Sequence, residues 1–320
     1  MRRIINSLLD NDLYTFSVCY AYLQKFPRAM GQYTFVDRNN TVYPKGFAEK
    51  LREQFDSFAD LRITSEEARF MKQKCYYFPL WFFTFLKGFH LRPSEVEVSQ
   101  DEEGHLHITV TGLLWRTVFW EMPILATVSE LMHELRGEFE HYDAEKEYQK
   151  SYDKAIRLIG NGVKFSDFGT RRRFSFEHQD KVIQSFIAAQ KQFTKTCFVG
   201  TSNVLLAMKY NLTPIGTMSH QFIETCSLYL DLTDDAVLDM YYLVRLIRHA
   251  ALVRHHDDGH TVVLVQLLQQ LHHLHRSLRV QCARRLIGQN NLWMGDECSG
   301  YCHALFLSSR QFVGVMFGPV

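Results

Sequence analysis

The stretch Phe165-Ser-Asp-Phe-Gly-Thr-Arg-Arg-Arg-Phe-Ser175 is followed along the chain by Phe198-Val-Gly-Thr-Ser-Asn203 and then by Pro214-Ile-Gly-Thr-Met-Ser-His220. Each segment has a few apolar residues that suit a strand, then Gly with Thr or Ser, and then a helical pattern or a reactive side chain. A β/α barrel presents the loops that form its binding site in this way. The three segments therefore predict successive strand ends that carry binding groups around one anion pocket.

The chain before these segments alternates between helical and strand patterns. Apolar residues recur at helical spacing over residues 14–26, 47–61, 64–74 and 123–135, and a charged helix is expected over residues 143–158. Alternation over residues 32–36 predicts a strand, and alternation on both sides of Asp101-Glu-Glu-Gly104 predicts a hairpin. Thr64 with Glu67 three residues later predicts a helix cap. A mixed α and β domain is therefore expected ahead of the barrel segments.

Length and charge limit the class of protein. A chain of 320 residues is long enough for two domains and a sizeable core. Its formal net charge of +1 implies neither a nucleic-acid-binding surface nor an acidic tail, so any anion binding must be local. Its seven cysteines have no framework spacing, which suits reduced thiols in a cytoplasmic protein. We interpret Cys19, Cys75 and Cys197 as packing residues.

Two stretches bear on membranes and secretion. The N-terminal Met1-Arg-Arg-Ile-Ile-Asn-Ser-Leu-Leu-Asp10 starts with basic residues, but polar and acidic residues interrupt it before a long apolar region forms. Secretion is therefore not expected. The most apolar run, residues 76–86, is far shorter than the roughly 20 residues that span a bilayer. It predicts a buried helix or strand pair, with no membrane partner.

Three consecutive arginines follow the first Gly-Thr turn. Arg171, Arg172 and Arg173 offer planar guanidinium donors for a carboxylate or a phosphate. The ordinary interpretation of a short charge run is a solvated basic patch. The arginines, however, follow a strand-like Val163-Lys-Phe165 and precede a long helical pattern, so we expect a barrel loop to point them inward.

The second and third loops leave alternatives open when their residues are considered alone. Backbone N–H groups and hydroxyls of Gly200-Thr-Ser-Asn203 could face an anion at the start of the following helix. A simple helix cap fits the same residues equally well. A lone histidine such as His220 is more often structural, and periodicity alone makes Tyr14 and Phe168 ordinary core residues.

The three segments, in this order and spacing, resemble nicotinate phosphoribosyltransferases, and Leu9-Asp-Asn-Asp-Leu-Tyr14 with its following helix is similar to that family's opening. The resemblance covers about residues 8–225. It implies an α/β protein of the type II phosphoribosyltransferase kind. An N-terminal mixed α/β sandwich-like domain is expected over residues 1–122, and the first part of an irregular, incomplete β/α barrel over residues 123–225.

The resemblance also implies roles for individual residues. Arg171, with Arg172 close behind, is the candidate for binding the nicotinate carboxylate or a nearby phosphate, whereas Arg173 could be structural. Phe168 would stack on the pyridine ring, and Tyr14 would supply the opposite face, from a second subunit in a homodimer. Ser202 stands where nicotinamide-using relatives carry an acidic residue, and its hydroxyl would remove repulsion against an acid substrate. The other loop candidates are Gly169, Thr170, Thr201 and Thr217.

The implied reaction joins nicotinate to 5-phosphoribosyl pyrophosphate and releases pyrophosphate, on the salvage route to NAD. ATP would be a cosubstrate that phosphorylates His220, because in this family that histidine couples ATP hydrolysis to product formation. Its ring nitrogen must be neutral to attack, as a histidine with a pKa near 6.5 is at neutral pH. Mg²⁺ and the arginines would hold the leaving group, so catalysis would come mostly from orientation and charge stabilisation.

The composition changes after residue 209. No lysine follows Lys209, whereas eight arginines do, and eight of the chain's 15 histidines lie between His249 and His303. A domain of different composition and a coding sequence read in a shifted frame both explain this change. The second is favoured because the family pattern is lost at nearly the same place. The family's later Arg-His-Asp-Ser-Gly-Asp type segment and Gly-rich phosphate loop are not found, so residues 226–320 are expected to form an atypical tail.

Two further hypotheses therefore stand beside the enzyme. One is a truncated or frame-shifted, inactive family member whose tail cannot close the barrel and leaves strand edges and apolar surface exposed. The other is a binding-only remnant that keeps affinity for nicotinate or phosphate through Arg171 and His220. Metal-like fragments in the tail, His255-His-Asp-Asp-Gly-His260 and Cys298 with Cys302 and His303, lack the ligand spacing of structural sites. No metal site is expected there.

Overall fold

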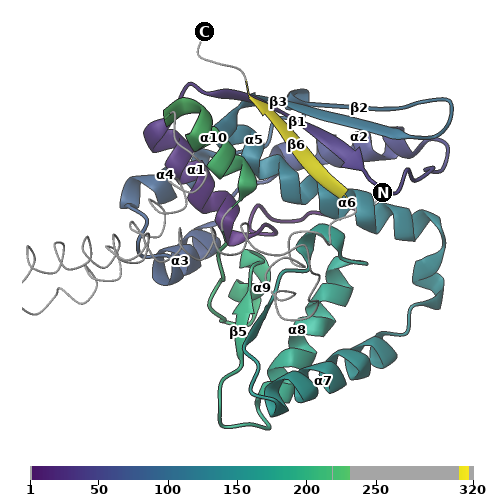
Figure 1. The fold of residues 1–320 in the computed structure, drawn as a ribbon, viewed down its shortest axis with the longest axis vertical. Helices are drawn as coiled ribbons and strands as arrows, with labels where there is room; N and C mark the ends of the chain where they lie inside the picture. Colours follow the sequence, from purple (N-terminus) through teal and green to yellow (C-terminus); the bar gives the residue numbers. More distant parts are fainter. Residues whose placement is uncertain (1, 218, 231–309, 317–320) are drawn as a thin grey trace, which may run out of the picture. The chain divides into compact units, whose positions relative to one another are not determined.

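The computed structural model describes residues 2–217, 219–230 and 310–316 (Figure 1). Contacts within the chain group residues 1–222 and 309–320 into one compact unit and residues 223–308 into a second, of which the structure describes only residues 223–230. The boundary predicted at residue 122 lies inside the first unit. Most of the predicted tail, residues 226–320, lies outside the described residues. Within the described ranges, every helix is too short or too polar to span a bilayer.

A four-stranded antiparallel sheet forms one part of the first unit. Its strand order is β2-β3-β1-β6, with β1 at Met30–Asp37, β2 at Val96–Gln100, β3 at Leu106–Leu113 and β6 at Arg310–Met316. The predicted strand and hairpin are thus confirmed. Strand β6 comes from the part of the chain where we expected only an atypical tail. It pairs along β1, with Thr34 opposite Val313, so the outer edge of β1 is hydrogen-bonded (Figure 1).

Four of the helices that accompany this sheet lie at predicted positions: α1 (Leu13–Lys25), α2 (Phe47–Ser57), α3 (Ser65–Lys74) and α6 (Glu121–Leu135). Helix α4 (Leu80–Gly88) forms from the apolar run of residues 76–86, and the short α5 (Leu114–Thr117) was not predicted. Short 3-10 turns lie at Phe58–Asp60, Pro93–Glu95, Val118–Trp120 and Glu138–His141. The predicted cap is confirmed, because Thr64 and Glu67 form a reciprocal capping box at the start of α3. Phe16, Phe119 and Trp120 are fully buried where these helices meet.

The apolar run of residues 76–86 is only half buried, so the prediction of a buried element was partly wrong. Helix α4 turns Phe82, Phe83 and Leu86 into the core. Leu80 and Trp81 lie on its other side and are 65% and 44% exposed. A helix of nine residues has two faces, and a continuous apolar run cannot place all its side chains on one of them.

The second half of the first unit contains the start of a β/α barrel. Strands β4 (Phe165–Asp167) and β5 (Phe198–Thr201) are parallel neighbours, joined through α8 (Phe176–Gln190), and α7 (Ala144–Gly160) packs on α8 (Figure 1). Helix α9 (Val204–Lys209) follows β5. A parallel bridge pairs Thr201 with Pro214, where the next strand of a barrel would lie. Helix α10 (His220–Leu230) follows. The expected incomplete barrel is confirmed, since no closed barrel forms among the residues described.

Gly200 occupies a backbone position that only glycine fits. Its φ is +143°, and a Cβ placed there would lie 2.3 Å from the carbonyl oxygen of Thr213. We expect Gly200→Ala to lower the free energy of unfolding by about 2–4 kcal/mol, because backbone strain and the clash add. Urea unfolding followed by circular dichroism measures this change.

Gly88 provides the matched control for that substitution. It ends helix α4, and a Cβ there would meet nothing within 4 Å. Gly88→Ala should therefore change the free energy of unfolding by less than about 1 kcal/mol. Equal losses in the two variants would show that the contact with Thr213 does not restrict position 200.

Candidate functional site

The N-terminal segment lies across the carboxyl ends of the two barrel strands. The backbone N–H of Leu13 donates to the carbonyl of Ser202 (2.9 Å), and that of Val204 donates to the carbonyl of Asn11 (3.0 Å). Residues before α1 therefore meet the loop after β5 directly. This contact brings the carboxylates of Asp10 and Asp12 to the strand ends, where the predicted loops also converge.

Arg173 is part of the protein interior. Its guanidinium forms a two-pronged ion pair with Asp10 (2.7 and 2.8 Å) and also reaches Glu130 (3.4 Å), and 1% of its side chain is exposed. Asn203 donates to the same Asp10 (2.7 Å). Because the planar fork of Arg173 already binds these buried carboxylates, it is not available to a ligand.

Arg171 lies at the same strand end but is held differently. Its Nη2 donates to the Tyr14 hydroxyl oxygen (2.8 Å) and lies 3.3 Å from Oε1 of Glu121, while 31% of its side chain is exposed. The Tyr14 hydroxyl in turn donates to Oε2 of Glu121 (2.6 Å). The charge of Glu121 raises the pKa of Arg171 further above its usual range. Arg171 is therefore a cation that is anchored on one side and still reaches solvent.

The two predicted aromatic walls differ in exposure. Phe168 is 44% exposed in the loop after β4 and is therefore accessible from solvent. Tyr14 is 1% exposed, and the guanidinium of Arg171 lies 5.7 Å from its ring centroid. In this chain Tyr14 therefore contacts Arg171 instead of presenting an open face. Arg172 is exposed beside them, and burial together with the charge of Arg171 lowers its pKa.

The hydroxyls of the second loop bond to carboxylates of the protein itself. Thr201 donates to Asp167 (2.7 Å) and Ser202 donates to Asp12 (2.7 Å). The side chain of Asn203 accepts from the backbone N–H of Leu206, so it caps α9. The structure thus shows the helix-cap geometry for this loop, with its hydroxyl groups directed at buried acidic groups.

Gly169 and Thr170 shape the first loop. The N–H of Gly169 donates to Asp167 (3.0 Å), which fixes the turn after β4. Thr170 is fully buried, and its hydroxyl oxygen accepts from Asn203 (3.2 Å) and from Gln179 (3.3 Å). Both residues therefore support the loop that carries Phe168 and Arg171.

Two predicted residues belong to the third loop. Thr217 is exposed, three positions after the bridge between Thr201 and Pro214. His220 is the first residue of α10, and its side chain lies outside the described part of the structure. Its predicted role therefore stays a prediction.

Asp12 has an unusual protonation equilibrium. Burial raises its pKa from 3.8 to about 6, against the opposing effects of Arg171 and of the hydrogen bond from Ser202. In an unfolded chain the carboxyl group loses its proton near pH 3.8, whereas the folded protein holds that proton up to about pH 6. Between these values the folded state binds more protons, so the contribution of Asp12 to stability falls as the pH rises.

The pH dependence gives a prediction for Asp12→Asn. An amide cannot ionise, so the variant should gain stability relative to the parent protein as pH rises from 4 to 7, by up to about 3 kcal/mol. Urea unfolding of both proteins at several pH values measures this difference, in which the other titrating groups cancel. A difference that stays constant across the range would show that Asp12 titrates normally.

The described carboxylates do not fit a metal ion. Among residues 2–217, 219–230 and 310–316, no three His, Cys, Asp or Glu side chains converge as metal ligands would. Asp10, Asp12 and Asp167 each accept hydrogen bonds from protein groups instead. The Mg²⁺ predicted from the resemblance therefore has no assigned ligand here.

The acidic partners of the arginines were not predicted from the sequence. Glu121 and Glu130 both lie on α6, a helix whose other buried residues are mostly apolar. A carboxylate within such an apolar helix was the available signal, because buried charges need partners. Which arginine each glutamate pairs with depends on the tertiary fold.

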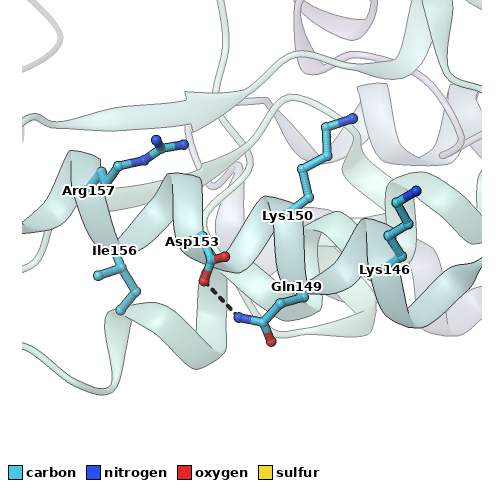
Figure 2. Close-up of a pocket in the computed structure, with 6 residues that line it drawn as sticks. All are labelled: Lys146, Gln149, Lys150, Asp153, Ile156 and Arg157. Carbon is cyan, nitrogen blue, oxygen red and sulfur yellow. Dashed lines mark hydrogen bonds between the residues drawn. The ribbon is translucent and has the colours of Figure 1, made fainter.

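An open hollow runs along one face of α7. Figure 2 shows its lining side chains, which all project from this one helix: Lys146, Gln149, Lys150, Asp153, Ile156 and Arg157. Gln149 donates to Asp153 across one turn (2.7 Å). The hollow shares no residue with the strand-end site, and its charges are those of a solvated helix face.

Two family models match the chain. Residues 9–129 match the nicotinate phosphoribosyltransferase (NAPRTase) N-terminal domain, and residues 163–257 match the nicotinate phosphoribosyltransferase (NAPRTase) family. The second match continues beyond residue 225, where we expected the resemblance to stop. The strand-end residues of both loops lie inside these matched ranges.

Individual relatives carry the same description. The nicotinate phosphoribosyltransferase of Chromohalobacter salexigens is 37% identical over 219 residues, which are 68% of this chain and 55% of that protein. That of Acinetobacter baumannii is 38% identical over 234 residues, 70% of this chain and 57% of that protein. The crystal structure of nicotinate phosphoribosyltransferase from Porphyromonas gingivalis is 39% identical with a TM-score of 0.65, over 70% of this chain and 56% of that one. The chain thus spans little more than half the length of these relatives.

Proposed function

The chain belongs to the nicotinate phosphoribosyltransferase family over residues 9–129 and 163–257, and from that premise we propose that it binds nicotinate and 5-phosphoribosyl pyrophosphate and joins them into nicotinate mononucleotide, with release of pyrophosphate. One observation carries this proposal furthest. The loop after β4 presents a solvent-accessible aromatic ring, Phe168, and an anchored cation, Arg171, at one strand end. An aromatic acid needs both kinds of contact.

The chemistry follows from those two side chains. Phe168 stacks on the pyridine ring, and Arg171 binds the carboxylate through charge-assisted hydrogen bonds. The ring nitrogen of nicotinate then attacks C1 of the ribose, and the bond from C1 to pyrophosphate breaks. Positive charge develops on the ribose during this step, so the protein contributes mainly orientation of the two substrates and charge stabilisation.

The finer parts of the proposal rest on the family. We propose that ATP phosphorylates His220 and that this step couples ATP hydrolysis to product formation, which would place the enzyme in the ligase class. Mg²⁺ would enter with the phosphorylated substrates, since pyrophosphate oxygens are hard ligands of the kind that it prefers. A homodimer in the cytoplasm, working in NAD salvage, completes the proposal.

Coupling to ATP gives the third prediction. Purified protein supplied with nicotinate, 5-phosphoribosyl pyrophosphate and Mg²⁺ should form nicotinate mononucleotide faster when ATP is added. His220→Ala should remove the stimulation by ATP, because the variant has no ring nitrogen to phosphorylate. Product is measured by liquid chromatography, and radiolabelled ATP reports the phosphohistidine.

His107→Ala is the matched control, since the side chain of His107 is exposed on β3, and this variant should leave the stimulation unchanged. An equal response to ATP in His220→Ala and the parent protein would refute the phosphohistidine.

A binding-only protein is the second candidate. The chain covers 55% to 57% of the relatives that it matches, so groups that those proteins supply from their remaining length have no counterpart in the matched part of this chain. Nicotinate binding in a calorimetric titration, without product formation by well-folded protein, would favour this candidate over the enzyme.

A further inference from the structure

We propose that Glu121 and Tyr14 are positioning residues that hold the guanidinium of Arg171 through Nη2 alone and leave its remaining N–H groups for the carboxylate of the substrate. The inference rests on the proposed function, because it concerns the same nicotinate site. It adds to that function a pair of residues that set how Arg171 meets its ligand.

The hydrogen bonds divide the two oxygens of Glu121 between two partners. Oε2 accepts from the Tyr14 hydroxyl (2.6 Å), and Oε1 lies 3.3 Å from Nη2 of Arg171. Tyr14 thus bridges the two groups, because its hydroxyl accepts from Nη2 of Arg171 and donates to Glu121. Within the described chain no hydrogen bond engages Nε or Nη1 of Arg171, so these N–H groups stay available.

A neighbouring arginine shows the opposite arrangement. Arg173, two positions further along, donates through Nη1 and Nη2 to both oxygens of Asp10 and through Nε to Glu130. All three nitrogens of its guanidinium are bonded within the protein, and its side chain is 1% exposed, against 31% for Arg171. The same loop thus holds one arginine completely and the other on one side only.

The negative charge of Glu121 is required for this position of Arg171. The guanidinium is largely surrounded by protein, and a charge taken out of water without a partner is costly. Glu121 starts helix α6, whose buried side chains fix it in the core, so the carboxylate cannot follow a moving arginine. With Gln at this position the guanidinium should turn toward solvent and lose its fixed orientation for a carboxylate ligand.

Two variants separate this role from a merely structural one. Phenylglyoxal modifies accessible guanidinium groups, and mass spectrometry can compare Arg171 with Arg69, an exposed arginine on α3. In Glu121→Gln the anchor is lost, so Arg171 should be modified about fivefold faster or more. In Tyr14→Phe the guanidinium loses the hydroxyl that accepts from Nη2 but keeps the charge of Glu121, so its modification should also become faster, by less than in Glu121→Gln.

Ligand binding supplies the second readout. Calorimetric titration should show nicotinate binding weakened about tenfold or more in Glu121→Gln and also weakened in Tyr14→Phe, as expected for a disturbed charge-assisted contact. Binding of nicotinamide, which has no carboxylate, should change by less than about threefold. Thermal melting confirms that each variant is folded.

The outcomes are distinct. Faster modification of Arg171 in both variants, with Arg69 unchanged and a selective loss of nicotinate binding, supports the proposal. Unchanged modification of Arg171 in both variants, or equal losses of nicotinate and nicotinamide binding, overturns it, because Glu121 and Tyr14 would then only stabilise the fold. If the parent protein binds no nicotinate while Arg171 is modified faster in both variants, the proposed function fails and the positioning of Arg171 stands.

Discussion

Replacing Arg173 by leucine is expected to lower the free energy of unfolding by about 3–5 kcal/mol. The substitution removes the only cation in contact with Asp10 among the described ion pairs and one of two in contact with Glu130, the other being Arg2. Both carboxylates are 2% exposed or less, so water cannot replace the lost partner. Burial already raises the pKa of Glu130, and without Arg173 that pKa should rise further.

Urea unfolding at pH 7 measures the loss, and lower pH tests its cause. Protonation removes the uncompensated charge, so the deficit of Arg173→Leu should shrink as the pH falls toward 5. Arg172→Leu is the matched control in the same loop, because Arg172 is exposed, and it should change stability by about 0.5 kcal/mol at most. Similar losses in the two variants would mean that the buried ion pair contributes no more to the free energy of unfolding than an exposed arginine does.

A second substitution tests the pairing itself. Asp10→Asn keeps the shape of the side chain and removes its charge, so combined with Arg173→Leu it should recover part of the lost stability. Additive losses in the double variant would show that the two residues act independently. The hydrogen bond that Asn203 donates to Asp10 can still form with the amide oxygen of Asn at this position. The double variant therefore reports on the charge of Asp10 and not on the loss of this contact.

Local periodicity was enough to predict most helices and strands of the first unit. The helix over residues 14–26 appears as Leu13–Lys25, and the hairpin around Gly104 as β2 and β3. Each depends on spacing between near neighbours, which the amino-acid sequence displays directly. Strand β6 could not be found in this way, because its partner β1 is far away in the chain and its own segment lies in a region of altered composition.

The candidate site was only partly predictable, for the same physical reason. The residue types of the Gly-Thr-Arg loop were enough to predict an anion-binding loop. The partners of its arginines could not be predicted in the same way. Asp10 and Arg173 are 163 positions apart, and Glu121 stands on a helix that looks apolar. The resemblance ranked the three adjacent arginines, but only the fold shows that Arg173 is interior, Arg171 anchored and Arg172 exposed.

Arg171→Ala is expected to weaken nicotinate binding about a hundredfold, while nicotinamide binding changes by less than about threefold. A hydrogen bond to a charged group contributes about 1.5–3 kcal/mol, and the fixed guanidinium offers more than one donor to a carboxylate. Removing it also leaves the charge of Glu121, 13% exposed, facing an anionic ligand. Calorimetric titrations with both pyridines measure the ratio, which is insensitive to a general loss of folded protein.

Arg171→Lys distinguishes geometry from charge in the same measurement. Lysine keeps the positive charge but presents a single ammonium group, so it can satisfy Glu121 or the ligand but not both with a fixed geometry. Nicotinate binding should therefore fall by at least about tenfold even though the net charge is unchanged. Binding equal to that of the parent protein would show that charge alone attracts the carboxylate, and the one-sided anchoring by Glu121 and Tyr14 would then have no part in recognition.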